Sequence, residues 1–397
     1  MSVGARHPLV DSTHKNRIRS RIDGIDILRG LSILFVLMNH VNMRLYLSKV
    51  PYTEGMPGQL VSSLVWNGQR GVQIFFCISG FLIASTSIKR WRSFSQMKVR
   101  DFYLLRIARI APLFILLLVL LSFLHVAKVD SFVISEAKGG LRGALLAALT
   151  FRVNVFEALH GYLPANWDIL WSLSVEEMFY LFFPIACFFL GRSKFMIGIL
   201  ALFIALGPFG RTVFTHGNEV WEEYSYLGSM DAISFGIFTA LIASRFRFSR
   251  VALGWLGGVG TVILIFSLGF TRIANHWGFA RVGIGMTVLA IGTCMVILAA
   301  VQSQWRAPWL TYPILKLGER SYEIYLTHMF VIIAFFHLFL KFEKPVAMIP
   351  ILFIASILTA GFLGDLVARF YSEPLNSYLR KKVKVAAEPE VGIRYNE

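Results

Sequence analysis

The first apolar segment of the chain carries two ionisable side chains that are expensive to bury in a membrane. Arg29 and His40 are eleven positions apart in a run that continues to Leu47. A helix rises about 1.5 Å per residue, so the two groups lie about 16 Å apart along its axis. That is roughly half of a ~30 Å hydrocarbon core. Because a charge at the bilayer centre costs about 2.5–3.5 kcal/mol, the pattern predicts that function requires these two groups.

His40 is the candidate for proton transfer. It lies beyond the midpoint of its predicted helix, with Asn39 and Asn42 as its polar neighbours in sequence. An imidazole changes charge near neutral pH, and its neutral form can accept the proton of an attacking hydroxyl. The alternative is that His40 makes only a hydrogen bond between helices.

Three arginines are candidates for binding an anion. Arg106 and Arg109 are three positions apart, so they share one face of a helix, and Pro112 follows them. Planar guanidinium groups match the geometry of phosphate. The alternative for this pair is that it only marks the cytoplasmic side of a span. Arg29 is either an anion contact or an interfacial anchor whose charge reaches water.

Glu176 is a carboxylate placed deep in a predicted span. It lies about eight residues inside, about 12 Å deep by helical rise, and shares a face with Ser172 and Tyr180. A carboxylate without a partner is costly there, so a cation or a proton must accompany it. Glu176 either pairs with an arginine or orients and charges His40. Glu177 points about 100° away and is the weaker candidate.

His328 and Tyr325 lie one turn apart on the predicted span 321–340. They are interpreted either as lining the path of an acceptor or as making structural hydrogen bonds. Ser79 and Gly80 lie inside an apolar helix, where small residues are typical of close helix packing. The sequence has no Gly-rich phosphate loop, no His-Glu-x-x-His and no Gly-x-Ser-x-Gly nucleophile elbow.

Five local patterns occur in an order that resembles the acyltransferase 3 family of membrane acyltransferases. The resemblance extends from Asp23 to Pro374, although Cys77 replaces a usual aliphatic residue and Gln73 stands where an acid is also common. The patterns are Arg29-x10-His40, Phe75-Phe-Cys-Ile-Ser79-Gly80-Phe81, Arg106-x-x-Arg109-x-x-Pro112, Trp171-Ser172-Leu173-x-x-Glu176-x-x-Phe179-Tyr180 and Ser321-Tyr322-x-x-Tyr325-Leu326-x-His328.

The resemblance implies an O-acyltransferase that uses acyl-coenzyme A, foremost acetyl-coenzyme A, as donor co-substrate. It implies no bound cofactor and no metal. The implied acceptor is a hydroxyl of a cell-surface saccharide, a lipid-linked glycan or a small secondary metabolite. In this scheme the catalytic residues are His40 and Glu176, the donor-binding residues are Arg29, Arg106 and Arg109, and the substrate-binding residues are Trp171, Ser172, Tyr180, Tyr325 and His328.

A secondary transporter or exporter of a small anionic or glycan substrate is the alternative function. Buried charges near the bilayer midplane are also typical of transporters. The Trp-Ser-Leu-x-x-Glu pattern favours the enzyme, and the sequence shows no inverted repeat.

The composition is that of an integral membrane protein. Of the 397 residues, 56% are hydrophobic and 16% are charged, against about 25% charged in soluble domains. We expect an all-α, polytopic bundle of about ten membrane-spanning helices. The segment 141–151 is short and is interpreted as re-entrant or interfacial. The ten predicted spans are 27–47, 71–88, 107–127, 169–190, 195–210, 226–243, 251–271, 282–301, 321–340 and 346–370.

The basic residues predict that both termini are cytoplasmic, and the resemblance implies a cell inner membrane of bacterial type. With ten spans, the Lys- and Arg-rich connections fall on one side and the acidic Glu219–Glu223 loop on the other, as the positive-inside rule requires. The net charge of +16 therefore reflects topology, and we expect the lipid bilayer rather than nucleic acid as partner.

We divide the chain into a basic segment 1–22, a transmembrane acyltransferase domain 23–374 and a tail 375–397. The first span is expected to be a retained helix rather than a signal peptide, and Cys77, Cys187 and Cys294 are expected to pack as small hydrophobic residues.

Overall fold

The computed structural model describes residues 22–191, 194–343 and 345–382, and every element assigned within these ranges is a helix. Most of the basic segment 1–22, the end of the tail and Arg192 therefore lie outside the described residues. In lipid each backbone polar group must be satisfied within its own segment, which favours helices. The fold class expected from the sequence is confirmed: the chain is a polytopic helical bundle.

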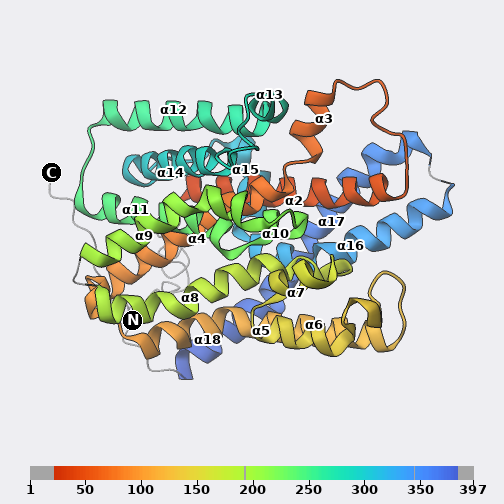
Figure 1. The fold of residues 1–397 in the computed structure, drawn as a ribbon, viewed down its shortest axis with the longest axis horizontal. Coiled ribbons are helices and arrows are strands. Elements are labelled where there is room, and N and C mark those ends of the chain that lie inside the picture. Colours follow the sequence, from red (N-terminus) through yellow and green to blue (C-terminus); the bar gives the residue numbers. More distant parts are fainter. Residues whose placement is uncertain (1–21, 192–193, 344, 383–397) are drawn as a thin grey trace, which may run out of the picture.

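Nine helices of the described part are long and apolar enough to cross a membrane. They run side by side along the long axis of the molecule (Figure 1). The predicted span 195–210 forms α9 (Lys194–Gly210), an apolar helix of 17 residues that is shorter than these nine. The nine contain α2 (Asp23–Leu47), α4 (Gly68–Trp91), α5 (Val99–Val126), α8 (Leu170–Leu190), α11 (Tyr226–Arg245), α12 (Arg250–Gly269), α14 (Gly285–Ser303), α16 (Ser321–Lys341) and α17 (Ile349–Val367).

Short helices cover the two ends of the bundle. The segment 141–151 forms α6 (Gly140–Leu149), whose ten residues are too few to span. At the right of Figure 1, α6 and α7 (Val153–His160) lie at the same end as α3 (Gly58–Val65). At the left, α18 (Glu373–Lys382) lies at the end where α4 stops and α5 begins. Three further short helices are α10 (Glu219–Tyr224), α13 (Thr271–His276) and α15 (Tyr312–Glu319).

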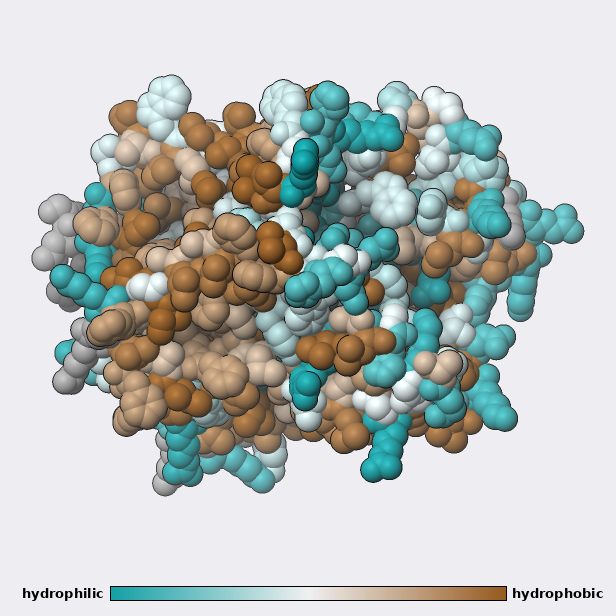
Figure 2. Space-filling model, in the orientation of Figure 1, coloured by the Kyte–Doolittle hydropathy of each residue, from teal (hydrophilic) through white to brown (hydrophobic). Residues whose placement is uncertain are grey.

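Apolar residues cover much of the surface that the spans present. In Figure 2 they form a broad area at the left and centre of the face shown, while hydrophilic residues gather toward the right end. Exposed apolar side chains recur along the outward faces of α12 and α17, for example Trp255, Val262, Ile354 and Phe362. Such faces suit contact with lipid chains.

Glycines allow the helices around the interior to pack closely. A Cβ added at Gly80 of α4 would collide with the backbone of Ile233 in α11, and one at Gly236 of α11 would collide with the backbone of Cys77 in α4. The predicted packing role of Gly80 is thus confirmed. All three cysteines are buried and free, as expected of small hydrophobic residues.

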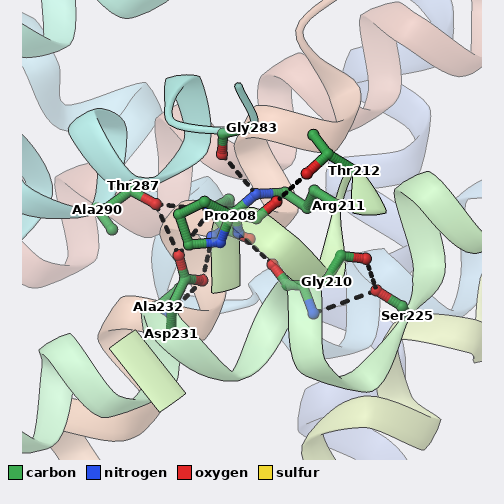
Figure 3. Close-up of polar contacts among 12 residues, drawn as sticks. Pro208, Gly210, Arg211, Thr212, Ser225, Asp231, Ala232, Gly283, Thr287 and Ala290 are labelled. Carbon is green, nitrogen blue, oxygen red and sulfur yellow. Dashed lines mark hydrogen bonds and ion pairs between the residues drawn. The ribbon is translucent and has the colours of Figure 1, made fainter. Parts of the chain in front are cut away.

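A buried ion pair connects four of the helical elements (Figure 3). Asp231 of α11 is 0% exposed, and its carboxylate lies 2.8 Å from the guanidinium of Arg211, just after α9. Thr287 of α14 donates to Asp231 over 2.9 Å, and Gln73 of α4 donates over 3.1 Å. Arg211 also donates to the carbonyl of Gly283 over 2.9 Å. Because these partners satisfy the two charges, the cluster fixes α4, which lines the cavity described next, against α9, α11 and α14.

Candidate functional site

A cavity of about 590 Å³ lies between α2, α4, α5, α8 and α16, with α18 at one end. These elements come from distant parts of the sequence and meet only through the packing of the bundle. The cavity runs from the C-terminal end of α4, where Trp91 lines it, to the interior, where Ser172 and Tyr325 line it. Its size is within the range of about 300–1,000 Å³ that is usual for small-molecule sites.

Five arginines give this cavity a strongly positive character. The carboxylates that line it are Asp26 and Glu176. Such an excess of positive charge in an enclosed space favours an anionic ligand. The arginines are Arg29, Arg90, Arg106, Arg109 and Arg380.

Arg106 and Arg109 both line the cavity. This confirms the prediction that they share one face of α5. The guanidinium carbon of Arg106 lies 3.6 Å from the centre of the Tyr180 ring, and that of Arg109 lies 5.8 Å from the centre of the Tyr322 ring. The α5 helix runs unbroken through Pro112. Tyr322 of α16 donates to the carbonyl of Ile110 over 3.0 Å, which holds this part of α5 against α16.

Glu176 is held by hydroxyl groups. One carboxylate oxygen accepts hydrogen bonds from Ser79 and from Tyr180. The predicted face of Ser172, Glu176 and Tyr180 is therefore directed to the interior. Ser79 belongs to this network and lines the cavity, although its sequence context indicated only helix packing. The Ser-Gly-Phe pattern was the available signal for it.

His328, not Glu176, contacts His40. Nε2 of His328 lies 3.3 Å from Nδ1 of His40, and the ring centres are 4.9 Å apart. His328 is 0% exposed. The expectation that Glu176 orients His40 therefore has no contact to support it, because Glu176 faces Ser79 and Tyr180.

The contacts of the two imidazoles determine which nitrogen carries each proton. Nδ1 of His328 lies 2.6 Å from the carbonyl oxygen of Tyr325 and must donate to it. In a neutral ring its Nε2 is then an acceptor. Nδ1 of His40 faces this acceptor and, at 2.9 Å, the carbonyl oxygen of Val36, so it carries the proton. Nε2 of His40 is left with the lone pair and can act as a base.

The imidazole pair adjoins the inner end of the cavity. Tyr325 lines that end, and its ring centre lies 5.8 Å from that of His328. Its hydroxyl is 2.6 Å from that of Ser172 and donates to the carbonyl of Ile169 over 3.1 Å. Tyr325 thus contacts both Ser172 and His328, and the substrate-binding role of the three residues stays a prediction. Trp171 is buried instead in a stack on Tyr224, with ring centres 4.1 Å apart.

Charged groups lie on the other side of His40 as well. Arg44, one turn after His40 on α2, interacts electrostatically with Asp168. Next to Asp168 lies Glu157 of α7, which is 0% exposed. Burial, together with the charge of Asp168, raises the pKa of the Glu157 carboxyl well above its usual range. Along α2, His40 therefore lies between Arg29, which lines the cavity, and Arg44, which interacts with Asp168.

Comparison with known proteins agrees with the family resemblance that the motifs indicate. The model of the acyltransferase domain family, acyltransferase 3, matches residues 22–364. The chain therefore belongs to the acyltransferase 3 family of integral, multi-pass membrane proteins.

The relatives are bacterial proteins named as O-acetyltransferases. The chain is 25% identical over 337 residues to a Staphylococcus aureus (strain COL) protein named "Putative O-acetyltransferase SACOL0978", covering 80% of this chain and 51% of the relative. It is 25% identical over 380 residues to O-acetyltransferase OatA of S. aureus (strain NCTC 8325 / PS 47), covering 89% of this chain and 57% of the relative. The chain thus spans about half the length of the curated relatives it matches. No solved structure matches it.

Proposed function

We propose that this protein transfers an acyl group, foremost acetyl, from cytoplasmic acyl-coenzyme A to a hydroxyl group. The acceptor is a cell-surface saccharide, a lipid-linked glycan or a small secondary metabolite, and the membrane is a bacterial inner membrane. The observation that supports this proposal best is the arginine-lined cavity ending beside the His40–His328 pair. Family membership and relatives named as O-acetyltransferases support the class of reaction.

The donor fits the cavity by charge and by length. Its phosphates would face Arg29, Arg106 and Arg109, whose guanidinium groups suit phosphate oxygens. Its pantetheine arm would extend along α2 toward Ser172 and Tyr325. The helical rise places His40 about 16 Å beyond Arg29. A pantetheine arm extended over this distance would bring the thioester carbonyl to the imidazole.

In the proposed reaction His40 acts as general base. Nε2 of His40 accepts the proton of the acceptor hydroxyl while the hydroxyl oxygen attacks the thioester carbon. The carbon–sulfur bond then breaks, and the thiolate of coenzyme A takes the proton from His40. The products are the ester and free coenzyme A, and the histidine returns to its starting state. His328 is a positioning residue in this scheme because it fixes the tautomer of His40.

The test is release of coenzyme A thiol from acetyl-coenzyme A by the purified protein, with membranes of the host as the source of acceptor. His40→Ala should lower the rate by about 10²–10⁴-fold, the range for loss of a general base, while donor binding is retained. His337→Ala, on the same helix as His328 but exposed, is the matched control and should keep the rate. Full transfer by His40→Ala would refute the mechanism. A transporter would release no thiol, which separates the alternative function.

The acceptor is sought in the host. Mass spectrometry of surface glycans, with and without the gene, should show the loss of one acetyl group on a saccharide. An unchanged glycan profile would direct the search to lipid-linked or small-molecule acceptors.

A further inference from the structure

The outer end of the cavity is built by side chains that lie outside the five family-like patterns. Arg90 and Trp91 come from the last turn of α4, Phe102 comes from the first turns of α5, and Arg380 comes from α18. This end, here called the cavity mouth and defined by these four residues, combines cationic groups with aromatic rings.

The position of α18 is fixed by its attachment to the bundle. A π-helical segment, Ala368–Ser372, precedes it, and such segments often occur at functional sites. Tyr371 of this segment donates to the carbonyl of Pro112 in α5 over 3.1 Å. The guanidinium of Arg320 bridges Asp365 of α17 at 3.0 Å and Glu373, the first residue of α18, at 2.5 Å. These contacts hold α18 against α5 and place Arg380 at the cavity.

Arg380 belongs to one face of α18, which also carries Glu373, Asn376, Ser377 and Lys381. Lys381 adds a second cation to this end of the helix.

A nucleotide has the two features that this mouth can recognise. Phosphate oxygens make charge-assisted hydrogen bonds with guanidinium groups, and a purine base stacks on the face of an aromatic ring. The deeper arginines, Arg29, Arg106 and Arg109, are already matched to the diphosphate. Arg380 and Trp91 line the same cavity nearer its outer end, where the adenosine end of the same molecule would lie.

We infer that the cavity mouth is the nucleotide subsite of the donor, in which Arg380 contacts the ribose 3′-phosphate and Trp91 stacks on adenine. This inference rests on the proposed function. It makes Arg380 and Trp91 specificity-determining residues that distinguish acyl-coenzyme A from acyl carriers without the nucleotide.

The experiment compares acetyl-coenzyme A with acetyl-dephospho-coenzyme A, which lacks only the 3′-phosphate. The wild type should show a KM lower by about ten- to hundredfold for the phosphorylated donor, the factor expected for one charge-assisted contact. Arg380→Ala should raise the KM for acetyl-coenzyme A to that for the dephospho donor and leave the latter unchanged. Turnover of the dephospho donor reports that the variant is folded. Lys382→Ala, on the same helix but not lining the cavity, is the matched control and should keep the wild-type ratio.

Trp91 is tested with a third donor, acetyl-pantetheine. Trp91→Ala should raise the KM of both nucleotide donors and leave that of acetyl-pantetheine unchanged, and Trp91→Phe should restore most of the binding. An equal loss with all three donors would overturn the stacking role.

The remaining outcomes distinguish a failure of the subsite from a failure of the proposed function. Equal KM values for the two nucleotide donors in the wild type would overturn the subsite alone. A KM difference between the two nucleotide donors that persists in Arg380→Ala would overturn it as well. An equal effect of Arg380→Ala on both donors would mean that the arginine contacts another group, such as a lipid phosphate, and would also overturn it. Failure of the wild type to turn over any of the donors would overturn the proposed function, and the subsite with it.

Discussion

At the scale of residues, the hydrogen bonds of the histidine pair leave one nitrogen available for catalysis. Nδ1 of His40 faces two acceptors, the Val36 carbonyl and Nε2 of His328. These contacts favour the tautomer whose Nε2 has a free lone pair. Neither His40 nor His328 lines the cavity, and the proposed role of His328 acts through the tautomer of His40.

Replacing His328 tests this positioning role. His328→Ala removes one hydrogen bond to His40, so kcat should fall by about tenfold, the upper value of one neutral hydrogen bond, while the donor KM stays unchanged. His328→Gln, whose side-chain oxygen can accept from His40, should restore part of kcat. Steady-state kinetics with acetyl-coenzyme A measure both. A change confined to protein yield, with kcat unaltered, would reduce His328 to a structural residue.

Replacing either of the two arginines on α5, Arg106 or Arg109, is predicted to weaken binding of the donor more than binding of the acceptor. Arg106→Ala and Arg109→Ala should each weaken binding of acetyl-coenzyme A by about 1.5–3 kcal/mol, the value of a hydrogen bond to a charged group. Titration calorimetry of purified variants measures this. Arg100→Ala is the matched control because Arg100 lies on the same helix but does not line the cavity. Wild-type donor affinity in both variants would leave them as markers of topology.

At the scale of elements, the ion pair of Arg211 and Asp231 is predicted to stabilise the fold around the site. Asp231→Ala would leave the buried Arg211 without its counter-charge, which typically costs about 3–5 kcal/mol. The melting temperature in detergent should therefore drop strongly. Glu222→Ala, an exposed acid in the same region of the sequence, should leave it unchanged. An unchanged melting temperature for Asp231→Ala would show that α4, α9, α11 and α14 are held by their apolar contacts alone.

The sequence predicts single elements better than the contacts between them. Apolar runs indicate the spans, and a spacing of three places Arg106 and Arg109 on one face, because both depend on local helical geometry. The partner of His40 could not be predicted in this way. His328 lies 288 positions away, and only the packing of α2 against α16 brings the rings together. Arg380 and Asp231 were missed for the same reason: nothing near them in sequence shows what they face.

At the scale of the whole molecule, the distribution of basic residues predicts the orientation in the membrane. α11 has 20 residues, about 30 Å by helical rise, and separates the loop after Phe214 from Arg250, the first residue of α12. A reporter fused after Phe214 should read as extracytoplasmic, and one fused after Arg250 should read as cytoplasmic. Alkaline phosphatase and fluorescent-protein fusions measure the two sides. Both reporters on the same side would refute the span count and, with it, the side from which the donor enters.

The α2 helix runs without interruption from Asp23 to Leu47, and this makes the spacing between Arg29 and His40 rigid. One extra residue inserted after Val36 would push His40 about 1.5 Å further and swing it by about 100° around the helix axis. The ring would then point away from His328 even though every side chain of the site is still present. We therefore expect the length of α2 between Arg29 and His40 to be a functional property of the protein. A deletion or insertion within this part of the helix should be more harmful than most single substitutions.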